Sequence, residues 1–334
     1  MLLISFGTRP EWIKIKPIID RIDGVIPYKI LFTGQHTSLV EEYLKDTFIV
    51  NIVEAGNNRL DSIVCSLLNK NALFDGITHV LVQGDTTSAF AVALAAFHRK
   101  IPVIHLEAGL RTFDIDNPYP EEFNRTAISA LADIHLCPTD TAASNVLSMV
   151  GHNSKIYVTG NTVLDNLVGL EPTISDIVLV TMHRRENHAQ MHEWFKAISV
   201  LALENPGLQF VLPLHPNPNV CKHKHLLTDV TVIDPLSYDK CIELIRICKT
   251  IITDSGGIQE ESSFFKKKCI VCRKVTERAE GIGTFAYICK EPSDLKPLFD
   301  SIISSGEFIV EEECPYGNGQ AAEKIMKIFR LENI

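Results

Sequence analysis

The 334-residue chain lacks several features that would assign it to a common class of protein. It has no excess of positive charge: Asp and Glu outnumber Lys and Arg by 41 to 32, and the net charge of −9 argues against a nucleic-acid partner. It has no long apolar run near its start, where MLLISF is too short for a signal peptide or a membrane span, so we expect no membrane partner. Its nine scattered cysteines, an odd number, favour reduced thiols and a cytoplasmic protein.

Three signatures of well-known active sites are missing as well. No G-x-G-x-x-G follows a predicted strand, and neither G-x-x-x-x-G-K-[ST] nor G-x-S-x-G occurs. The chain therefore has no dinucleotide fingerprint, no P-loop and no nucleophile elbow. Cys269 and Cys272 have C-x-x-C spacing, but residues three apart in a strand point to opposite faces, so a shared metal is not expected.

What the chain does have is a regular alternation of β-branched runs with amphipathic runs, of which residues 88–100 are the clearest helix. This alternation predicts parallel sheets with helical crossovers. In the first half we expect strands at 2–6, 28–34, 79–85, 102–109 and 134–140. In the second half we expect strands at 177–182, 208–215, 229–234, 250–256 and 268–274.

The stretch 160–176 contains Gly, Pro and Asp residues that break regular structure, and it marks the join between the halves. The prediction is an α/β protein with two Rossmann-like domains. In open α/β sheets a ligand binds outside the carboxyl ends of the strands, so a cleft between two such domains is the expected site.

The segment FGTRPEWIK, residues 6–14, predicts a strand, a glycine turn and a helix with Thr8 as N-cap and Pro10 at its first position. Arg9 and Lys14 flank this helix N-terminus. Free backbone N–H groups and the helix dipole both favour an anion there. An ordinary βα turn with solvated charges is the alternative.

The segment TDSGGIQEE, residues 253–261, repeats this pattern in the second half. Ser255, Gly256 and Gly257 would let a ligand approach the backbone at the start of a helix. Glu261 follows one turn later, and because a carboxylate repels phosphate, its expected partner is a diol such as a ribose. Diphosphate at the glycines and ribose at Glu261 describe a nucleotide.

Charged residues also crowd between positions 103 and 125, where Glu107, Glu121 and Arg125 follow an apolar strand. Asp85 ends the preceding predicted strand in VQGDTTS and would share a sheet edge with Glu107, although capping of the next helix is the alternative. Grouped carboxylates at a sheet edge suit proton transfer.

Histidines end two strands of the second half. His183 stands in TMHRRENH beside two arginines, and His215 stands in LPLHPNP. A lone histidine is often structural, but two at the strand ends of one domain, with arginines, favour a clamp on phosphate.

These segments together resemble one known family. The order of motifs is similar to that of the non-hydrolysing UDP-N-acetylglucosamine 2-epimerases and runs from residue 4 to about residue 330. The motifs are FGTRPEWIK, GDTTS, HLEAGLRT, PEEFNR, GNTVLDNL, HRREN, HPNPNV, TDSGGIQEE and TER.

The resemblance implies a GT-B-like fold, in which two Rossmann-like domains stand around a cleft, and a homodimer. We expect an N-terminal domain at 1–165 that carries the acid/base carboxylates and a C-terminal domain at 166–316 that binds UDP. Residues 317–334 would form a helix that packs back on the first domain.

The implied reaction interconverts UDP-GlcNAc and UDP-ManNAc, with no cofactor and no catalytic metal, for the synthesis of surface polysaccharide precursors. The C2 proton is removed as UDP leaves C1 in an anti elimination, which gives a bound 2-acetamidoglucal. UDP then adds back while C2 is protonated on its other face. Because this C2 hydrogen is weakly acidic, its removal needs a positioned base and a departing group together.

The resemblance also implies a role for each candidate residue. The acid/base candidates are Asp85, Glu107 and Glu121, and which carboxylate serves which face of C2 stays open. Arg125 would hold a carboxylate in place, Lys14 would lie near the reacting centre, and His183 would stabilise or protonate the departing phosphate. The residues expected to bind the UDP-sugar are Arg9, Lys14, His215, Ser255, Gly256, Gly257, Glu261 and Arg278.

The chain departs from the family pattern at a few positions. Ala279 follows TER where the family usually has Pro, and the region 166–176 is shorter than in many members. Thr37 and Ser38 replace an Arg-Glu pair found in bacterial members, some of which bind a second UDP-GlcNAc there, so that site is not expected. Cys241 replaces an aromatic residue that commonly stacks near the uracil, which would loosen nucleotide binding or mark a different UDP-sugar.

Other functions remain open at this stage. The substrate could be another UDP-2-acetamido sugar, or the chemistry could be hydrolytic and release UDP and free ManNAc. A GT-B glycosyltransferase is a different class, and the grouped carboxylates of the first domain argue against it. A non-catalytic sensor of UDP-sugars would not need a complete acid/base set.

Overall fold

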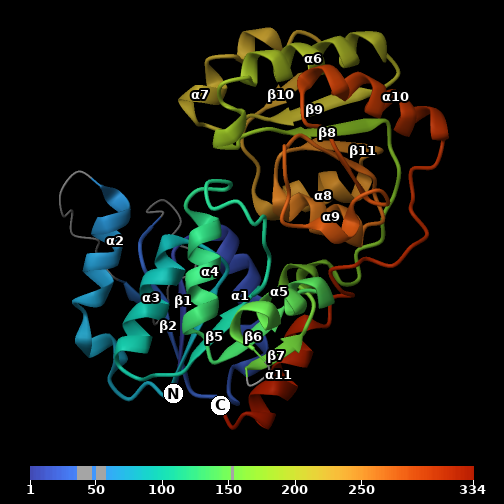
Figure 1. Ribbon diagram of the computed structural model, residues 1–334. Coiled ribbons are helices and arrows are strands. Elements are labelled where there is room, and N and C mark those ends of the chain that lie inside the picture. The colour runs from blue at the N-terminus through green and yellow to red at the C-terminus, as the bar shows by residue number, and fades with distance from the viewer. Residues whose placement is uncertain (36–46, 50–57, 152–153) are drawn as a thin grey trace. The chain divides into compact units, whose positions relative to one another are not determined.

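The structure, a computed structural model, describes residues 1–35, 47–49, 58–151 and 154–334 (Figure 1). Thr37 and Ser38 lie outside the described residues. The chain divides into two compact units. Unit 1 contains Met1–Val168 and Gly317–Ile334, and unit 2 contains Gly169–Tyr316.

Unit 1 is built on a seven-stranded sheet with the order β3-β2-β1-β4-β5-β6-β7. All pairings between these strands are parallel. Its strands are β1 (Leu2–Phe6), β2 (Tyr28–Phe32), β3 (Thr47–Ile49), β4 (His79–Gln83), β5 (Val103–Leu106), β6 (Ile134–Cys137) and β7 (Lys155–Val158). Its helices are α1 (Arg9–Ile22), α2 (Arg59–Leu68), α3 (Thr87–His98), α4 (Glu121–Leu131), α5 (Asp140–Val150) and α11 (Ala321–Leu331), with 3-10 turns at Asn71–Phe74 and Thr162–Leu167.

Apolar helices cover both faces of this sheet. On one face, α1 and α11 pack on strand residues such as Leu2 and Ile4. On the other face, α2, α3 and α4 pack on Leu3 and Val80. Successive residues of β1 thus point to opposite helical layers, which explains why its five residues are apolar or small and all buried.

Unit 2 is built on a six-stranded sheet with the order β10-β9-β8-β11-β12-β13, again with parallel pairings between its strands. Its strands are β8 (Ile177–Thr181), β9 (Gln209–Pro213), β10 (Thr231–Ile233), β11 (Thr250–Thr253), β12 (Cys269–Val271) and β13 (Ala286–Ile288). Its helices are α6 (Met191–Glu204), α7 (Pro218–Cys221), α8 (Tyr238–Ile247), α9 (Gly256–Phe264) and α10 (Leu295–Ser305), with 3-10 turns at Arg185–Asn187, Lys224–Leu226, Ala279–Gly281 and Pro292–Asp294. The core of unit 2 joins α6 and α10 to one face of the sheet, and α8 and α9 lie against the other face (Figure 1).

Both sheets have the doubly wound order in which the first strand lies next to the fourth. The direction of winding therefore reverses between β1 and β4 in unit 1, and between β8 and β11 in unit 2. The loops that leave these paired strands diverge to opposite faces of the sheet. Open α/β sheets bind ligands outside the carboxyl ends of the strands at such a reversal. The fold prediction of two Rossmann-like domains is confirmed.

Each of the ten predicted strands is present, but most end two or three residues earlier than expected. Positive backbone φ angles explain two of these ends, because Gly84 at +66° and Glu107 at +64° turn the chain away from the sheet. The helix expected from Pro10 begins one residue earlier, at Arg9, with Thr8 as its N-cap. The short strands β3, β7 and β13 had not been predicted.

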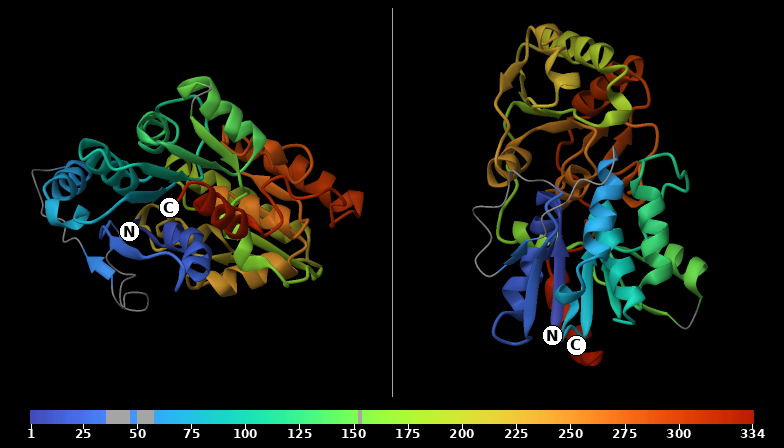
Figure 2. Two further views of the ribbon diagram at one scale, coloured as in Figure 1. Left: turned by 90° about the horizontal axis from the view of Figure 1, so that it is seen from below. Right: turned by 90° about the vertical axis from the view of Figure 1, so that its left-hand side faces the viewer.

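The C-terminal helix α11 returns to unit 1, as the fold prediction had it. The carboxylate of Asp165 accepts hydrogen bonds from the backbone N–H groups of Ala321 (3.1 Å) and Ala322 (2.9 Å), so a residue distant in sequence caps the start of α11. At the other end, Glu332 accepts hydrogen bonds from Lys155 and Tyr157. Both termini consequently lie at the same end of unit 1 (Figure 2). No helix in the described part of the chain has the length and apolar character needed to cross a bilayer.

Replacing Asp165 by Ala should release the start of α11, because two backbone donors lose their acceptor. We expect a loss of about 1–2 kcal/mol in the free energy of unfolding. Urea unfolding followed by circular dichroism measures this loss, and amide hydrogen exchange should accelerate in 321–331. The matched control is Glu323→Ala on the same helix, where the side chain is 46% exposed and pairs with Lys327. Equal effects of the two variants would contradict the capping role of Asp165.

Candidate active site

In unit 1, the candidate carboxylates Asp85 and Glu107 lie on loops that leave the central strands. The other candidates of this unit lie on helices, Arg9 and Lys14 on α1 and Glu121 and Arg125 on α4. Gly7 follows β1, Gly84 and Asp85 follow β4, and Glu107 follows β5. Gly7 has to be a glycine, because a Cβ atom there would lie 2.5 Å from the Thr33 hydroxyl oxygen. The sheet order brings these three loops to adjacent positions at one edge of the sheet.

Glu107 lies at the centre of this group. Its side chain is 6% exposed, and Lys14 Nζ lies 2.5 and 2.6 Å from its two carboxylate oxygens. Gln83 donates a hydrogen bond to Oε2, and Asn161 Nδ2 donates one to Oε1 at 2.9 Å. A non-glycine residue with positive φ is uncommon and marks a position that the surrounding structure has to enforce. Here the four side-chain contacts supply that enforcement.

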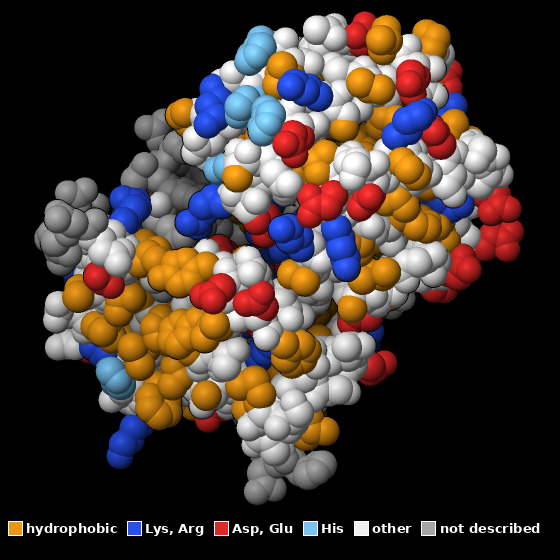
Figure 3. All heavy atoms as spheres, turned by 45° about the horizontal axis from the view of Figure 1, so that its top comes forward, with side chains coloured by type: hydrophobic (Ala, Val, Ile, Leu, Met, Phe, Trp, Pro, Cys, Tyr) orange, Lys and Arg blue, Asp and Glu red, His pale blue; other side chains and the backbone are white. Residues whose placement is uncertain are grey.

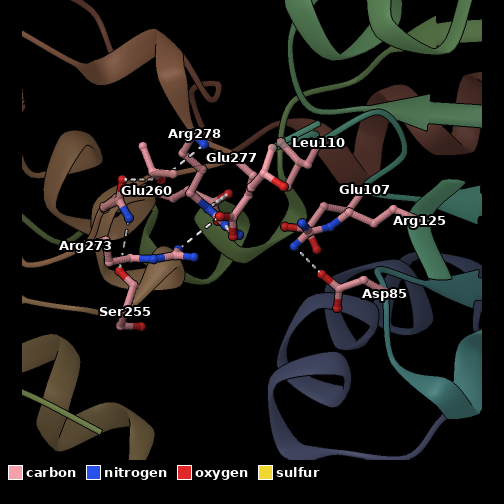
Figure 4. A network of polar contacts seen from close by, with 12 residues as sticks. Asp85, Glu107, Leu110, Arg125, Ser255, Glu260, Arg273, Glu277 and Arg278 are labelled. Atoms are coloured by element: carbon pink, nitrogen blue, oxygen red, sulfur yellow. Dashed lines mark hydrogen bonds and ion pairs between the residues drawn. The ribbon is translucent and has the colours of Figure 1, made fainter. Parts of the chain in front are cut away.

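Asp85 lies in a second ion pair, drawn in Figure 4. Its Oδ2 atom is 2.5 Å from Arg125 Nη2, and Asn124 Nδ2 donates a hydrogen bond to its backbone carbonyl at 2.9 Å. The helix cap that follows belongs to Thr86, whose hydroxyl oxygen accepts from the Ala89 N–H group. The alternative in which Asp85 caps this helix is therefore wrong, and its carboxylate is held by Arg125.

Glu122, which is not among the predicted site residues, has a structural role in the charged 103–125 segment. It is 3% exposed, lies 3.1 Å from Arg125 Nη1, and accepts hydrogen bonds from the N–H groups of Thr112 and Phe113. Its carboxylate therefore fixes the loop before α4 and orients Arg125. Glu121, the predicted acid/base residue, is half-buried and begins the same helix. The helical period could have identified Glu122, because it shares a buried face with Arg125 at i+3.

Glu11 is a further buried acid that sequence reasoning missed. It is 2% exposed and accepts hydrogen bonds from the Gly7 N–H group (3.0 Å) and from the hydroxyls of Thr8 (2.7 Å) and Thr86 (2.8 Å). Burial raises the pKa of Glu11 to about 7. Its carboxylate joins the loops that follow β1 and β4, and the one backbone N–H group that it accepts from, that of Gly7, precedes the helix. Of the two cations expected there, Lys14 is bound to a carboxylate.

In unit 2, Asp254 organises the loop that contains His183. Asp254 is fully buried at the end of β11 and accepts hydrogen bonds from the N–H groups of His183 (2.9 Å) and Arg184 (2.8 Å) and from Asn187 Nδ2 (3.1 Å). Its Oδ1 atom also lies 3.5 Å from His183 Nδ1. The signal was present in the sequence, because Asp254 stands between a buried strand and SGG.

The rings of His183 and His215 stack with their centroids 5.2 Å apart, so the two predicted phosphate contacts lie together. Burial lowers the pKa of His183 below its usual range, and Asp254 opposes this effect. Burial also lowers the pKa of His215. The neutral imidazole is consequently favoured for both residues near neutral pH.

The glycine-rich turn Ser255–Gly257 leads into α9, whose N-cap is Ser255. A Cβ atom on Gly256 would lie 2.4 Å from Arg278 Nη1, whereas one on Gly257 would meet nothing within 4 Å. The absence of a side chain therefore has a different effect at each of the two glycines. Gly256 admits the Arg278 side chain, and Gly257 leaves open space at the helix N-terminus.

A chain of buried ion pairs holds Arg278 (Figure 4). Arg278 Nε lies 2.7 Å from Glu260, and its Nη1 atom contacts Glu277. Glu277 also lies 3.0 Å from Arg273, which in turn contacts Glu186 at 2.8 Å. Each of these buried charges is compensated within unit 2, which is the condition for a stable buried ion. Among the predicted nucleotide contacts, Glu261 is buried beside Tyr238, and burial together with the charge of Glu261 raises the pKa of Tyr238 well above its usual range.

Histidines gather on unit 2 (Figure 3), but they do not build a metal centre within the residues that the structure describes. No group of three or more His, Cys, Asp or Glu side chains has the required arrangement there. Cys221 lies near His215 rather than in a ligand set, and its thiol donates to the His215 carbonyl. All nine cysteines are free thiols.

The chain has two doubly wound sheets, and in each of them polar residues follow the strands where the direction of winding reverses. This arrangement places the chain in the GT-B-like class of α/β enzymes. A family model described as UDP-N-acetylglucosamine 2-epimerase matches residues 21–330. The chain belongs to this family, whose members are isomerases.

Two curated relatives named UDP-N-acetylglucosamine 2-epimerase match almost the whole chain. The one from Campylobacter jejuni is 36% identical and covers 98% of this chain and 96% of its own, and the one from Neisseria meningitidis serogroup A is 37% identical with 98% of each chain covered. The crystal structure of the UDP-GlcNAc 2-epimerase from Neisseria meningitidis bound to UDP-GlcNAc matches with a TM-score of 0.89 and 34% identity, over 99% of both chains. The family resemblance seen in the sequence is thereby confirmed.

The two glycines of the α9 turn provide a test of this site. Gly256→Ala should lower the free energy of unfolding of unit 2 by about 1–3 kcal/mol, because the new methyl group displaces the Arg278 guanidinium. Gly257→Ala should change it by less than about 1 kcal/mol, since Ala favours a helix and meets no neighbour. Chemical denaturation of both variants measures the difference. A larger loss for Gly257→Ala than for Gly256→Ala would show that the packing of Arg278 on Gly256 is unimportant.

Proposed function

We propose that the chain is a non-hydrolysing UDP-N-acetylglucosamine 2-epimerase that interconverts UDP-GlcNAc and UDP-ManNAc. The observation that carries this proposal is the pair of strand-end carboxylates of unit 1, Asp85 and Glu107, each held by its own cation. Proton transfer at both faces of one carbon needs more than one positioned acid/base group. A relative of this family binds UDP-GlcNAc in its crystal structure, which supports the same ligand here.

In the proposed reaction, a carboxylate removes the proton from C2 while the C1–O bond to UDP breaks on the opposite face. This elimination gives a 2-acetamidoglucal and UDP, and nothing is oxidised or reduced. UDP then adds back to C1 while a second acid delivers a proton to the other face of C2. Asp85, Glu107 and Glu121 are the proposed proton carriers, and Arg125 and Lys14 are proposed to orient them.

Unit 2 is proposed to bind the nucleotide. The open N-terminus of α9 at Gly257 offers backbone N–H groups and the helix dipole to a diphosphate. Ser255 and Gly256 complete the turn, and His215 and Arg278 are proposed contacts of the UDP group. Arg9, which lies on α1 of unit 1, is a further proposed contact. Glu261 is the proposed partner of the ribose hydroxyls.

His183 is proposed to stabilise the departing phosphate. Its backbone N–H group is held by Asp254, and the same carboxylate faces its Nδ1 atom. This arrangement favours the tautomer in which Nδ1 carries a proton and Nε2 faces outward. A phosphate beside the ring would favour its protonated form, so the ring could give a proton to the leaving group and take it back.

A single experiment separates the candidate functions. The protein is incubated with UDP-GlcNAc in deuterated water and followed by NMR. We expect UDP-ManNAc that carries deuterium at C2. Free ManNAc would indicate the hydrolysing reaction, and the absence of turnover without an acceptor would favour a GT-B glycosyltransferase or an epimerase of another UDP-2-acetamido sugar.

Asp85→Asn, Glu107→Gln and Glu121→Gln should each lose deuterium exchange at C2, by at least about a hundredfold, while they retain UDP. The amides keep the size of the side chains but cannot accept a proton. Exchange is measured by NMR and UDP binding by calorimetry. Glu171→Gln, on an exposed residue of unit 2, is a control that should keep full exchange. Normal exchange in all three active-site variants would refute the assignment of proton carriers.

We further propose that the chain forms a homodimer through unit 1. Exposed apolar side chains gather on the helices of unit 1 (Figure 3). The exposed apolar residues of these helices include Phe97 of α3 (53% exposed), Phe123 of α4 (45%) and Leu147 of α5 (37%). An apolar area of this kind is a common feature of subunit interfaces. Light scattering should give twice the mass of one chain, and Phe97→Glu should shift the protein toward the monomer.

The nine free thiols support a cytoplasmic location, and the proposed role in surface polysaccharide precursor synthesis rests on the family alone.

A further inference from the structure

Two buried amide side chains with no role in the proposed function converge on Glu107. Gln83 is the last residue of β4 and is 4% exposed, and Asn161 precedes the 3-10 turn Thr162–Leu167 and is 3% exposed. Gln83 Nε2 donates to Oε2 of Glu107, and Asn161 Nδ2 donates to Oε1. The two amides, which belong to different elements of unit 1, therefore donate hydrogen bonds to the two different oxygens of one carboxylate.

These two hydrogen bonds fix the orientation of the Glu107 carboxylate, which Lys14 alone does not. A lysine ammonium is a point charge on a flexible stem, so it attracts a carboxylate without fixing the plane in which its oxygens lie. Two donors from separate, buried backbones fix both oxygens, as outer hydrogen bonds do for other reactive side chains. Glu107 also has a positive φ of 64°, an uncommon backbone conformation for a non-glycine residue that the surrounding contacts have to maintain.

We propose that Gln83 and Asn161 are positioning residues for the reaction, which hold the Glu107 carboxylate in the orientation required for proton transfer. This inference rests on the proposed function, because it assigns the two amides a task within that reaction. Neither residue needs to touch the sugar. Their effect passes through Glu107, where a displacement of about 1 Å can cost about a hundredfold in rate.

Gln83→Met tests the proposal, since methionine keeps the length of the side chain and removes the donor. We expect kcat for C2 exchange to fall about tenfold to a hundredfold, with KM for UDP-GlcNAc changed less than about threefold. Asn161→Asp is the second variant. It keeps the oxygen that accepts from the Val163 N–H group but presents a carboxylate to Glu107, so its loss should be larger. Gln190→Met is the matched control, because Gln190 donates to Glu291 in unit 2 and should keep full activity.

A titration independent of turnover completes the test. With 13C-labelled glutamate carboxyl groups, and Glu107 assigned through Glu107→Gln, the apparent pKa of Glu107 should be higher in Gln83→Met than in the parent, because a donor to the ionised form is lost. An active parent whose Gln83→Met variant keeps both its kcat and its Glu107 titration would overturn the positioning role. Absence of C2 exchange in the parent would instead refute the proposed function, so the two failures are distinguishable.

Discussion

Burial of acidic side chains at the ends of parallel strands is the constraint on which the rest of this structure depends. A buried carboxylate is tolerated only when cations or N–H groups compensate it, because isolated charge in a protein interior costs several kcal/mol. In unit 1 this requirement recruits Lys14 from α1 and Arg125 from α4 to meet the acids that follow β4 and β5. In unit 2 it recruits the backbone of the 183–187 loop to Asp254. The loops at both switch points therefore take their shape from the acids that they surround.

The same pairing makes the two carboxylates of unit 1 chemically different. Asp85 has a side chain that is 28% exposed and contacts one arginine nitrogen, whereas the Glu107 side chain is 6% exposed and receives four contacts from three residues. A reaction that removes a proton from one face of a carbon and adds one to the other face needs groups that differ in this way. Asp85 is therefore more open to water than Glu107.

Much of the fold could be predicted from the sequence, because long buried strands have a strong apolar signal. The strands that escaped prediction, β3, β7 and β13, stand at the edges of their sheets and have three or four residues each. Half of β7 is exposed, so it lacks the apolar run of a central strand. Such strands form because a neighbouring strand offers free backbone groups, and the sequence of the short strand does not show which strand that is. Strand ends were overestimated for a related reason: the residues that terminate them, such as Gly84 and Glu107, do so through backbone torsions that residue type indicates only weakly.

The residue types of the candidate site could be predicted from the sequence better than the contacts between these residues. Residue types at strand ends identified Asp85, Glu107 and the SGG turn, because spacing along the chain is enough to place a side chain at the edge of a sheet. The hydrogen-bond partners were not predictable in the same way. Lys14 and Glu107 are 93 positions apart, and they meet only because β4 lies between β1 and β5 in the sheet. Sequence reasoning therefore places polar groups at the edge of the sheet, while strand order decides which of them neutralise one another.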